Sequence, residues 1–504
     1  MDSLEQEAFE VLSLVRSLKN SFAPINRIPP EVFTLIPNHY DAHRSDRDLI
    51  RSTHVCRSWR EILISRSSLW ARLDCMNVDK TRTFIQRSES SPLDILLISC
   101  WYKTYLDDAL SLVIPHVPRL RSLDISYGTD TVPNSSFLSH FRRHAPLLED
   151  LQISLHHSHP LILDPGLFGD DLSTLRELCL REVITQLPWE NMANLRVFDL
   201  RCPLGCEVTV TQLLDFFESA PLLRTIDIED SIPESSDAPP ERTVSLCHLK
   251  SLYINADPVH SILRHLNIPV GASLTVWTGL SDEESPLLDY FVETTPNIKN
   301  LSHITAVNLR FCHEYKGVQL TGPSASFCFH APWGDQATPS SIMDHRILRS
   351  ISQRIFSTTH RLIISEYSHT NPANVDECPV FQALSSTNNL RTLTLIECKN
   401  QPFISALDPE KNASKSVLCP KLEEIILYAG SWYFIKTLIS MAKGRASRGA
   451  KLSSIMLMGL GSSAPGKGVS ELRDHVMCVG YMDSDIEVPE WDYLSDESES
   501  GVGI

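Results

Sequence analysis

The hexapeptide LRSLDI at residues 120–125 recurs along the chain and indicates the fold of most of it. Close copies are LEDLQI at 148–153, LRELCL at 175–180, LRVFDL at 195–200 and LRTIDI at 223–228. Further copies start at Leu249, Leu390, Leu422 and Leu452, and weaker ones at Ile304 and Thr359. In each copy the residues at positions four and six are apolar and point to one side of an extended strand. The hexapeptide therefore predicts one buried strand per copy.

The spacing of these copies predicts a solenoid. Clear neighbours are 20 to 32 residues apart, a period typical of leucine-rich repeats. Helix-like patterns occupy several of the intervals, at 134–145, 209–220, 257–267 and 431–446. We therefore expect an α/β fold over residues 92–481, with one helix and one strand per repeat and a parallel sheet on the concave face of a horseshoe. Residues 268–345 are less regular, and we expect degenerate strands there, one at Leu274–Trp277, or an inserted loop.

Acidic residues occupy the positions of the first repeats that we expect on the concave face: Asp124, Asp150, Glu177, Asp199 and Asp227. Parallel strands lie about 4.8 Å apart, so we expect these carboxylates to form one patch. Two explanations stay open. Arginines at position two of the repeats, such as Arg121 and Arg176, would pair with the acids, or the patch would bind a basic target. Later repeats differ, with Ile426 and Met456 expected to be exposed on the same face.

A second decisive stretch is IPPEVFTLIPNHYDAHRSDRDLIRSTHVCRSWREILISRSSLW, residues 28–70. The proline pair followed by Glu31 is typical of a helix start, and Pro37 is expected to end that helix. A second helix is expected to begin at Asp46 or Asp48, with Val55 and Trp59 on one apolar face. So short a segment cannot bury its aliphatic and tryptophan side chains alone. It packs on the rest of the chain or binds another protein.

The phrases IPPEV, HVCRSWRE and SSLW, in this order, resemble an F-box, and residues 28–75 are expected to form this domain. The whole arrangement, including the leucine-rich array, resembles a large group of F-box proteins from mushroom-forming fungi. The resemblance implies docking on the Skp-type adaptor of a cullin-based ubiquitin ligase. It places eleven residues where they face the adaptor or hold the module together: Ile28, Pro29, Pro30, Glu31, Val32, Ile36, Val55, Cys56, Trp59, Leu69 and Trp70.

The chain ends add two expectations. Residues 1–27 should form an amphipathic lead helix, with Leu4, Ala8, Leu12, Val15, Leu18 and Phe22 on one side. We expect it to pack against the module behind it rather than act as a separate binding helix. Residues 482–504 should form a disordered acidic tail, because 483–500 hold eight Asp or Glu and no Lys or Arg.

Composition excludes several classes of protein. The net charge of −17 argues against a general nucleic-acid binder, and no apolar run is long enough to span a membrane. Thirteen cysteines without a disulfide framework suit the cytoplasm or the nucleus. We find no hydrolase, nucleotide-binding or zinc-protease motif, and expect neither an enzyme nor a cofactor. His156–His159, the pair Cys202 and Cys206, and Cys247 beside His248 are weak metal or nucleophile candidates that favour a structural interpretation.

The resemblance to F-box proteins, together with the repeat array, implies a substrate-recognition subunit of a cullin-type (SCF) ubiquitin ligase. Its expected partners are the adaptor and an unknown target protein. The alternative is a leucine-rich-repeat scaffold outside any ligase. Residues 28–70 would then cap the first repeat, since terminal repeats need a cover.

Overall fold

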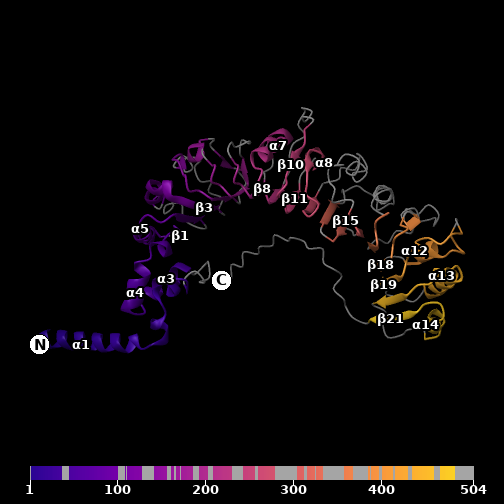
Figure 1. Cartoon of the computed structure of the whole chain (residues 1–504), viewed down its shortest axis with the longest axis horizontal. Coiled ribbons are helices and arrows are strands. Elements are labelled where there is room, and N and C mark those ends of the chain that lie inside the picture. The colour runs from indigo at the N-terminus through magenta and orange to yellow at the C-terminus, as the bar shows by residue number, and fades with distance from the viewer. Residues whose placement is uncertain are drawn as a thin grey trace. The chain divides into compact units, whose positions relative to one another are not determined.

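A computed structural model of the chain describes most of the predicted elements (Figure 1). Among the residues that the structure describes, which the next sentence gives, no helix is both long and apolar enough to cross a membrane. The described residues are 2–36, 45–75, 77–99, 108, 110–127, 141–155, 161–163, 166–170, 172–184, 192–201, 208–229, 242–255, 259–277, 303–311, 315–323, 325–332, 357–366, 384–385, 387–396, 400–412, 415–428, 434–458 and 466–482.

The chain divides into two compact units, Met1–Pro240 and Glu241–Ile504. The first begins with a helical region and continues as an α/β region. The helical elements are α1 (Asp2–Ser21), η1 (Pro24–Arg27), α2 (Pro30–Phe33), α3 (Ser45–Thr53), α4 (Arg57–Ile64) and η3 (Ser67–Trp70). The lead helix is thus confirmed as a helix. The acidic tail beyond Met482 lies outside the described residues, as does Pro37.

A parallel sheet follows in the first unit. Its strands pair in the order β1 (Arg72–Leu73), β2 (Leu93–Ser99), β3 (Leu120–Tyr127), β4 (Asp150–Leu155), β6 (Glu177–Arg181), β8 (Val197–Arg201) and β9 (Thr225–Glu229). Each hexapeptide from LRSLDI to LRTIDI overlaps one of these strands, which confirms the strand prediction. The apolar residues at positions one, four and six of every copy are buried, as Leu120, Leu123 and Ile125 illustrate.

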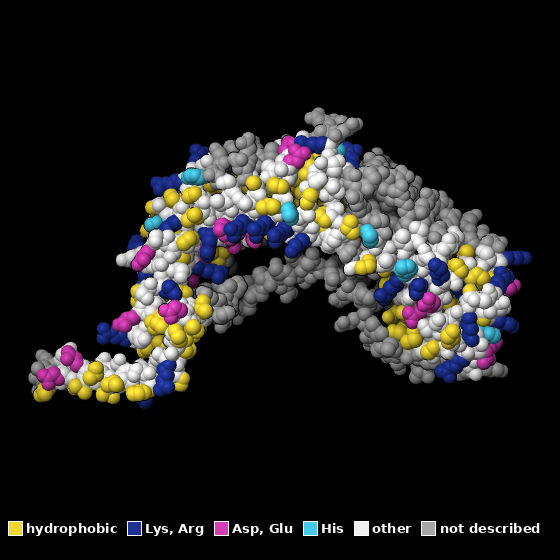
Figure 2. All heavy atoms as spheres, viewed as in Figure 1, with side chains coloured by type: hydrophobic (Ala, Val, Ile, Leu, Met, Phe, Trp, Pro, Cys, Tyr) yellow, Lys and Arg dark blue, Asp and Glu magenta, His cyan; other side chains and the backbone are white. Residues whose placement is uncertain are grey.

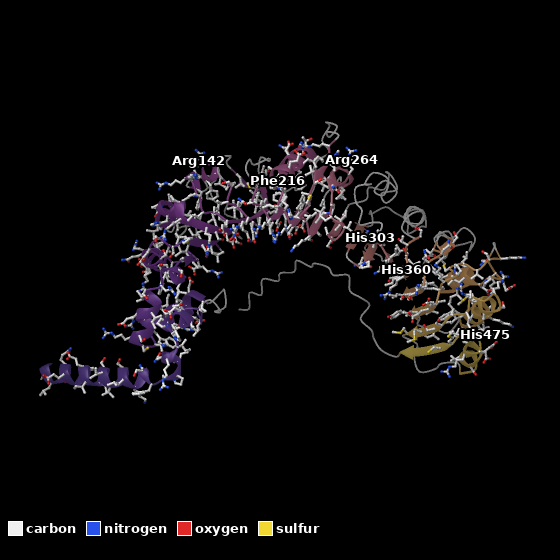
Figure 3. The ribbon with its side chains drawn as sticks, viewed as in Figure 1. Arg142, Phe216, Arg264, His303, His360 and His475 are labelled. Carbon is white, nitrogen blue, oxygen red and sulfur yellow. The ribbon has the colours of Figure 1, made fainter. Side chains whose placement is uncertain are left out.

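Helices cover the buried side of this sheet. They are α5 (Val78–Arg87) between β1 and β2, and α7 (Val210–Ser219) between β8 and β9. A capping box of Thr209 and Gln212 starts α7, and Phe216 packs its ring 4.4 Å from that of Phe198 on β8 (Figure 3). The prediction of one helix per repeat is only partly right. The described connections between β4 and β8 hold short elements instead: β5 (Leu161–Ile162), η6 (Leu167–Asp170) and β7 (Val183–Ile184), while η4 (Ile114–Arg119) precedes β3.

The second unit contains a sheet of mixed direction. Its strands pair in the order β11 (Ser251–Asn255), β13 (Ser273–Trp277), β16 (Ala325–Pro332), β15 (Tyr315–Gly322), β14 (Ala306–Phe311), β17 (Arg361–Glu366), β18 (Thr392–Ile396), β19 (Glu424–Tyr428), β20 (Ser454–Met458) and β21 (Cys478–Met482). Among the described strands of this sheet, β15 alone runs antiparallel to its neighbours. The strand expected at Leu274–Trp277 is confirmed.

The described residues of the irregular middle include a three-stranded meander, β14–β15–β16, in a sheet whose other described strand pairs are parallel. Sequence reasoning did not predict it. The antiparallel strand β15 has no hexapeptide. Only residues 312–314 separate it from β14 and residues 323–324 from β16, so neither connection is long enough for a helix. At Gly322 the backbone passes so close to His303 that a Cβ atom would lie 2.2 Å from the His303 carbonyl oxygen.

Helices α8 (Val259–Leu263), α12 (Asn400–Leu407), α13 (Ile435–Ser447) and α14 (Gly466–Arg473) complete the described part of this unit. A small parallel pair, β10 (Val244–Ser245) with β12 (Leu266–Asn267), lies apart from the main sheet. The buried Arg445 of α13 donates to the carbonyl oxygens of Leu418 and Cys419 at 2.7 and 2.9 Å. This guanidinium joins the helix to the turn that precedes β19.

Candidate docking module and sheet face

Helix α2 begins as the sequence predicts. Pro30 stands at its first position and Glu31 lies in its first turn. The helix ends at Phe33, earlier than expected, and Thr34 donates its hydroxyl to the Glu31 carbonyl oxygen at 2.9 Å. Phe33 is buried, whereas Val32 is 51% exposed.

The second predicted helix is two helices. Residues 54–56 interrupt it between α3 and α4, and Cys56 takes the extended conformation of an N-cap. Val55 therefore does not share a helix with Trp59, and its side chain is 58% exposed. The Arg60 guanidinium donates to the carbonyl oxygen of Thr53 at 3.0 Å and holds the two helices at this break. The sequence pattern missed the break because i, i+4 spacing across it mimics one continuous face.

Trp59 holds the module together rather than standing free. Its ring meets Phe33 of α2 edge-on at 4.7 Å between centroids, and its indole N–H donates to Asn26 at 2.6 Å. Asn26 belongs to η1, outside the predicted boundary at residue 28. The sequence carried no signal for this contact, because a polar side chain that reaches across 33 residues leaves no periodicity.

Trp70 joins the helical module to the sheet. It is fully buried, its indole N–H donates to the Leu63 carbonyl oxygen at 2.8 Å, and Phe84 of α5 lies 5.0 Å away. The Arg87 guanidinium covers the same ring at 4.3 Å. Trp70 therefore cannot contact a partner protein in this structure.

The remaining predicted docking residues fall into two groups. Ile28, Ile36, Cys56 and Leu69 are half-buried, and Pro29, Pro30, Glu31 and Val32 are exposed together with Val55. Sequence reasoning left out other exposed apolar side chains of this region: Ile25, Leu35 (55% exposed) and Ile64. Helical spacing could not reveal Ile25 and Leu35, because both lie outside the α-helices.

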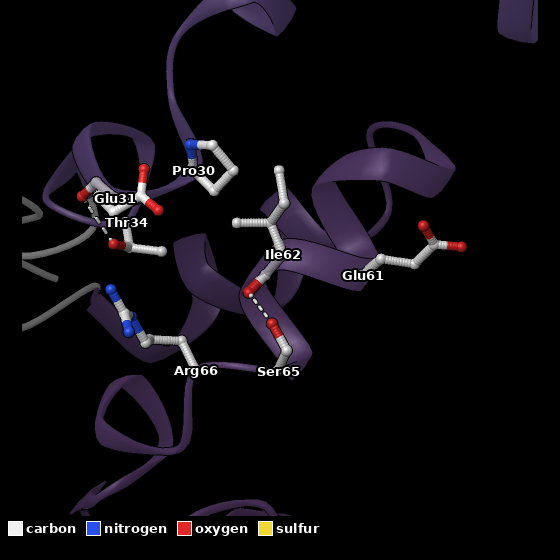
Figure 4. A pocket seen from close by; sticks show the side chains of 7 residues that line it. All are labelled: Pro30, Glu31, Thr34, Glu61, Ile62, Ser65 and Arg66. Carbon is white, nitrogen blue, oxygen red and sulfur yellow. Dashed lines mark hydrogen bonds between the residues drawn. The ribbon is translucent and has the colours of Figure 1, made fainter.

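A groove of about 360 Å³ lies between α2 and α4 (Figure 4). Pro30 and Thr34 face Ile62 and Arg66 across it, and Glu61 points away. The remaining lining residues are Glu31 and Ser65. The lining of the groove therefore combines the apolar Pro30 and Ile62 with polar and charged side chains.

The strand register divides the predicted acidic patch of the first sheet into two neighbouring rows. The strand register places Asp150 beside Glu177, and Asp199 beside Asp227, on separate rows. Asp124 is paired with Gln152 on β4, and two strands, β4 and β6, separate it from Asp199 on β8. Positions three and five of the hexapeptide lie on the same sheet face in neighbouring rows, so target binding by these acidic residues stays a prediction.

Among the described ion pairs, arginines pair with one of the five predicted acids, Asp199, whereas the expected arginines Arg121 and Arg176 pair with other acids of the sheet. Arg121 forms a two-point ion pair with Asp94 on β2, and Arg176 pairs with Glu149 at 3.3 Å. Asp199 is 9% exposed and receives two N–H groups of Arg181, at 2.7 and 3.1 Å. Figure 2 shows Lys and Arg side chains next to acidic ones along the sheet edge of this unit.

Asp227 has the most unusual environment of these acids. Burial, followed by repulsion from Asp199 and Glu229, raises its pKa to about 7, against the attraction of Arg201 and Arg181. Arg201 is itself paired with Glu229 at 3.0 Å. Near neutral pH Asp227 is therefore only partly charged.

A pocket of about 340 Å³ opens on the same sheet face over β1–β4. Asp94, Asp124 and Asp150 line it with Arg72 and Arg121. Burial raises the pKa of Asp124, and burial with repulsion from Glu177 raises that of Asp150. A cation entering the pocket would lower both pKa values, so the pocket favours a basic group over an acidic one.

Ile426 and Met456, expected to be exposed, are half-buried.

Burial raises the pKa of Cys75 and of Cys179 to about 12 and that of Cys419 to about 11, which keeps these thiols protonated. Among the described residues, no three His, Cys, Asp or Glu side chains are grouped so that they could hold a metal ion. Cys247 and His248 are exposed, whereas His156–His159, Cys202 and Cys206 lie outside the described residues.

The lead helix does not pack as predicted. The side chains of residues 4–21 of α1 are all exposed, so among described residues nothing covers its apolar side.

Comparison with known proteins gives one family match. The model of the F-box-like family matches residues 25–76, close to the predicted 28–75. A search of curated proteins finds no match. The matched range holds η1, α2, α3, α4 and η3, including the Asn26–Trp59 bond and the buried Trp70. The chain thus carries a helical F-box-like domain, followed by an α/β region with parallel strands.

Proposed function

We propose that the protein is the substrate-recognition subunit of a cullin-type (SCF) ubiquitin ligase. F-box domains typically bind Skp-type adaptors, and the match at residues 25–76 is the observation that carries the proposal. The domain would attach the chain to the adaptor and through it to a cullin, in the cytoplasm or the nucleus. The chain would supply no catalytic group, since ubiquitin transfer would belong to a separate conjugating enzyme and this chain would only hold the target near it.

Exposed apolar side chains of the F-box-like domain support the docking role. Val32, Leu35 and Val55 are each more than half exposed, although they belong to a domain with a buried core at Phe33 and Leu63. Moving such a side chain out of water contributes about 1.5–3 kcal/mol. An adaptor helix that covers two of them would supply a large share of the binding free energy.

The test uses the full chain and a Skp-type adaptor. Val32→Asp combined with Val55→Asp places charges on exposed positions, so the fold should persist while adaptor binding falls at least about 100-fold. Met477→Asp is the control, because Met477 is an exposed apolar residue of the second unit, outside the F-box-like domain. Adaptor binding that survives the double substitution, or that is absent from the unmodified chain, would refute the docking role.

The α/β region would act as a leucine-rich-repeat solenoid that binds the target protein. The pocket over β1–β4 favours a basic target segment, because three of its lining residues are aspartates and the pKa values of two are raised. Affinity capture with the docking-deficient variant would retain undegraded targets. Adding Asp124→Asn and Asp150→Asn should reduce that capture more at low salt than at high salt.

A second candidate function has its own support. The domain also caps the sheet, since Trp70 packs on Phe84 and Lys80 of α5 binds Asp46 of α3 at 2.9 Å. A scaffold outside any ligase would need only this cap. The adaptor-binding assay separates the two functions, because the scaffold predicts no binding at all.

A further inference from the structure

Helix α1 carries more exposed large apolar side chains than any other described element. Over 20 residues this helix exposes Leu4, Phe9, Val11, Leu12, Leu14, Val15 and Leu18, and Phe22 follows directly after it, each at least 45% accessible. Figure 2 shows apolar side chains in a row along the helix. Helices in proteins gain most of their stability from packing an apolar face, so a partner that covers this side would stabilise α1.

The order of these residues defines the geometry of that partner. Apolar residues alternate at steps of four and three: Leu4, Ala8, Val11, Val15, Leu18 and Phe22. This is the heptad pattern of a coiled coil, with Leu4, Val11 and Leu18 at the d positions and Ala8, Val15 and Phe22 at the a positions. Such a stripe fits another helix with the same spacing.

The charges of α1 are separated along its length. Glu5, Glu7 and Glu10 lie in the first half, whereas Arg16 and Lys19 lie in the second. A second α1 that ran parallel would place acid against acid. One that ran antiparallel would place the acidic half of each helix against the basic half of the other.

We propose that α1 pairs in an antiparallel coiled coil with α1 of a second copy of this chain. Val11 would then face the partner's Val15, and Leu4 the partner's Phe22. At the e positions Glu5 would face the partner's Lys19, twice by symmetry. Two copies related in this way form a closed dimer with a self-complementary interface.

The flanking positions favour this direction independently. Leu12 at e and Leu14 at g are apolar where a parallel pair needs polar groups. In a parallel pair Leu14 would face the partner's Lys19. In the antiparallel pair Leu12 faces the partner's Leu12 and Leu14 the partner's Leu14, so both leucines are covered.

The dimer does not depend on the proposed ligase role. It uses no residue of the F-box-like domain at 25–76, and each dimer would present two such domains.

The first test is sedimentation equilibrium of the full chain up to about 100 μM, a concentration at which even weak dimers form. We expect a mass that rises with concentration towards twice the 56.7 kDa of the monomer. Val15→Asp should raise the dissociation constant at least about 30-fold, because it buries a charge at the interface. Ser13→Asp adds the same charge on the outer f position and should leave dimerisation unchanged. A chain that stays monomeric, or a dimer indifferent to Val15→Asp, would overturn the proposal.

The second test shows whether the two α1 helices run parallel or antiparallel. Glu5→Lys and Lys19→Glu should each weaken the dimer about fivefold or more, because each creates two like-charge contacts. The double variant Glu5→Lys with Lys19→Glu should recover the original dissociation constant. A parallel pair brings these positions into no contact, so failure of the double variant to recover would exclude the antiparallel arrangement. Circular dichroism should show the rest of the fold unchanged in every variant.

Discussion

The raised pKa of Asp227 gives a quantitative test of the first sheet. An aspartate whose pKa moves from 3.8 to about 7 on folding binds a proton more tightly in the folded chain than in the unfolded chain. Its favourable contribution is complete below pH 3.8 and is lost as the pH rises through about 7. The variant Asp227→Asn keeps the shape and stays uncharged. It should therefore be more stable than the unmodified chain at pH 8 and lose that advantage towards pH 5.

The size of the effect follows from the pKa shift and the partial exposure. Each pKa unit corresponds to about 1.36 kcal/mol, so about three units set an upper limit of about 4 kcal/mol. Asp227 is only half-buried, and solvent screens its repulsion from Asp199 and Glu229. We expect the stabilisation by Asp227→Asn to be about 1–2 kcal/mol larger at pH 8 than at pH 5.

Urea unfolding followed by circular dichroism at both pH values measures this difference. Glu471→Gln on α14 is the matched control, because it removes one carboxylate from an exposed position. The control should show no such pH dependence. Equal effects of Asp227→Asn at pH 5 and pH 8 would refute the argument, and destabilisation at pH 8 would show that Asp227 is a stabilising charge.

Three further substitutions test the packing, each by the midpoint of urea unfolding. Trp70→Ala should cost about 3–5 kcal/mol because it opens a cavity between the helical module and the sheet, and a cost below about 1 kcal/mol would contradict this role. Arg445→Ala should cost about 3 kcal/mol, since two buried carbonyl groups lose their donor; an unchanged midpoint would show that these hydrogen bonds contribute nothing. Gly322→Ala should cost about 1–3 kcal/mol because its Cβ would clash with His303, whereas Gly271→Ala, with nothing within 4 Å, should be nearly neutral. Equal costs for the two glycine variants would exclude the clash.

Local patterns in the sequence were sufficient for the individual elements. The hexapeptide identified the strands because positions four and six of each copy are buried on one side, as at Leu123 and Ile125. Helix α1 and helix α7 followed from helical periodicity, and the F-box-like phrases located the domain within three residues of its matched start.

Local patterns could not predict contacts between residues that are far apart in the sequence. The bond between Asn26 and Trp59, the place of Trp70 against Phe84, and the antiparallel strand β15 all depend on which segments meet. The acidic residues show this most clearly. The sequence predicted one carboxylate patch, but strand register divides it into rows, and Arg181 neutralises Asp199.

The sequence by itself determined where strands and helices form and which side chains are apolar, because periodicity is a property of neighbouring residues. Only the tertiary structure decided which of those side chains are covered. It buries Trp70, leaves Val32 and Val55 exposed, and leaves the stripe of α1 uncovered. The physical reason is that burial depends on the register and packing of segments far apart in the chain, and these are the contacts from which the docking and pairing proposals arise.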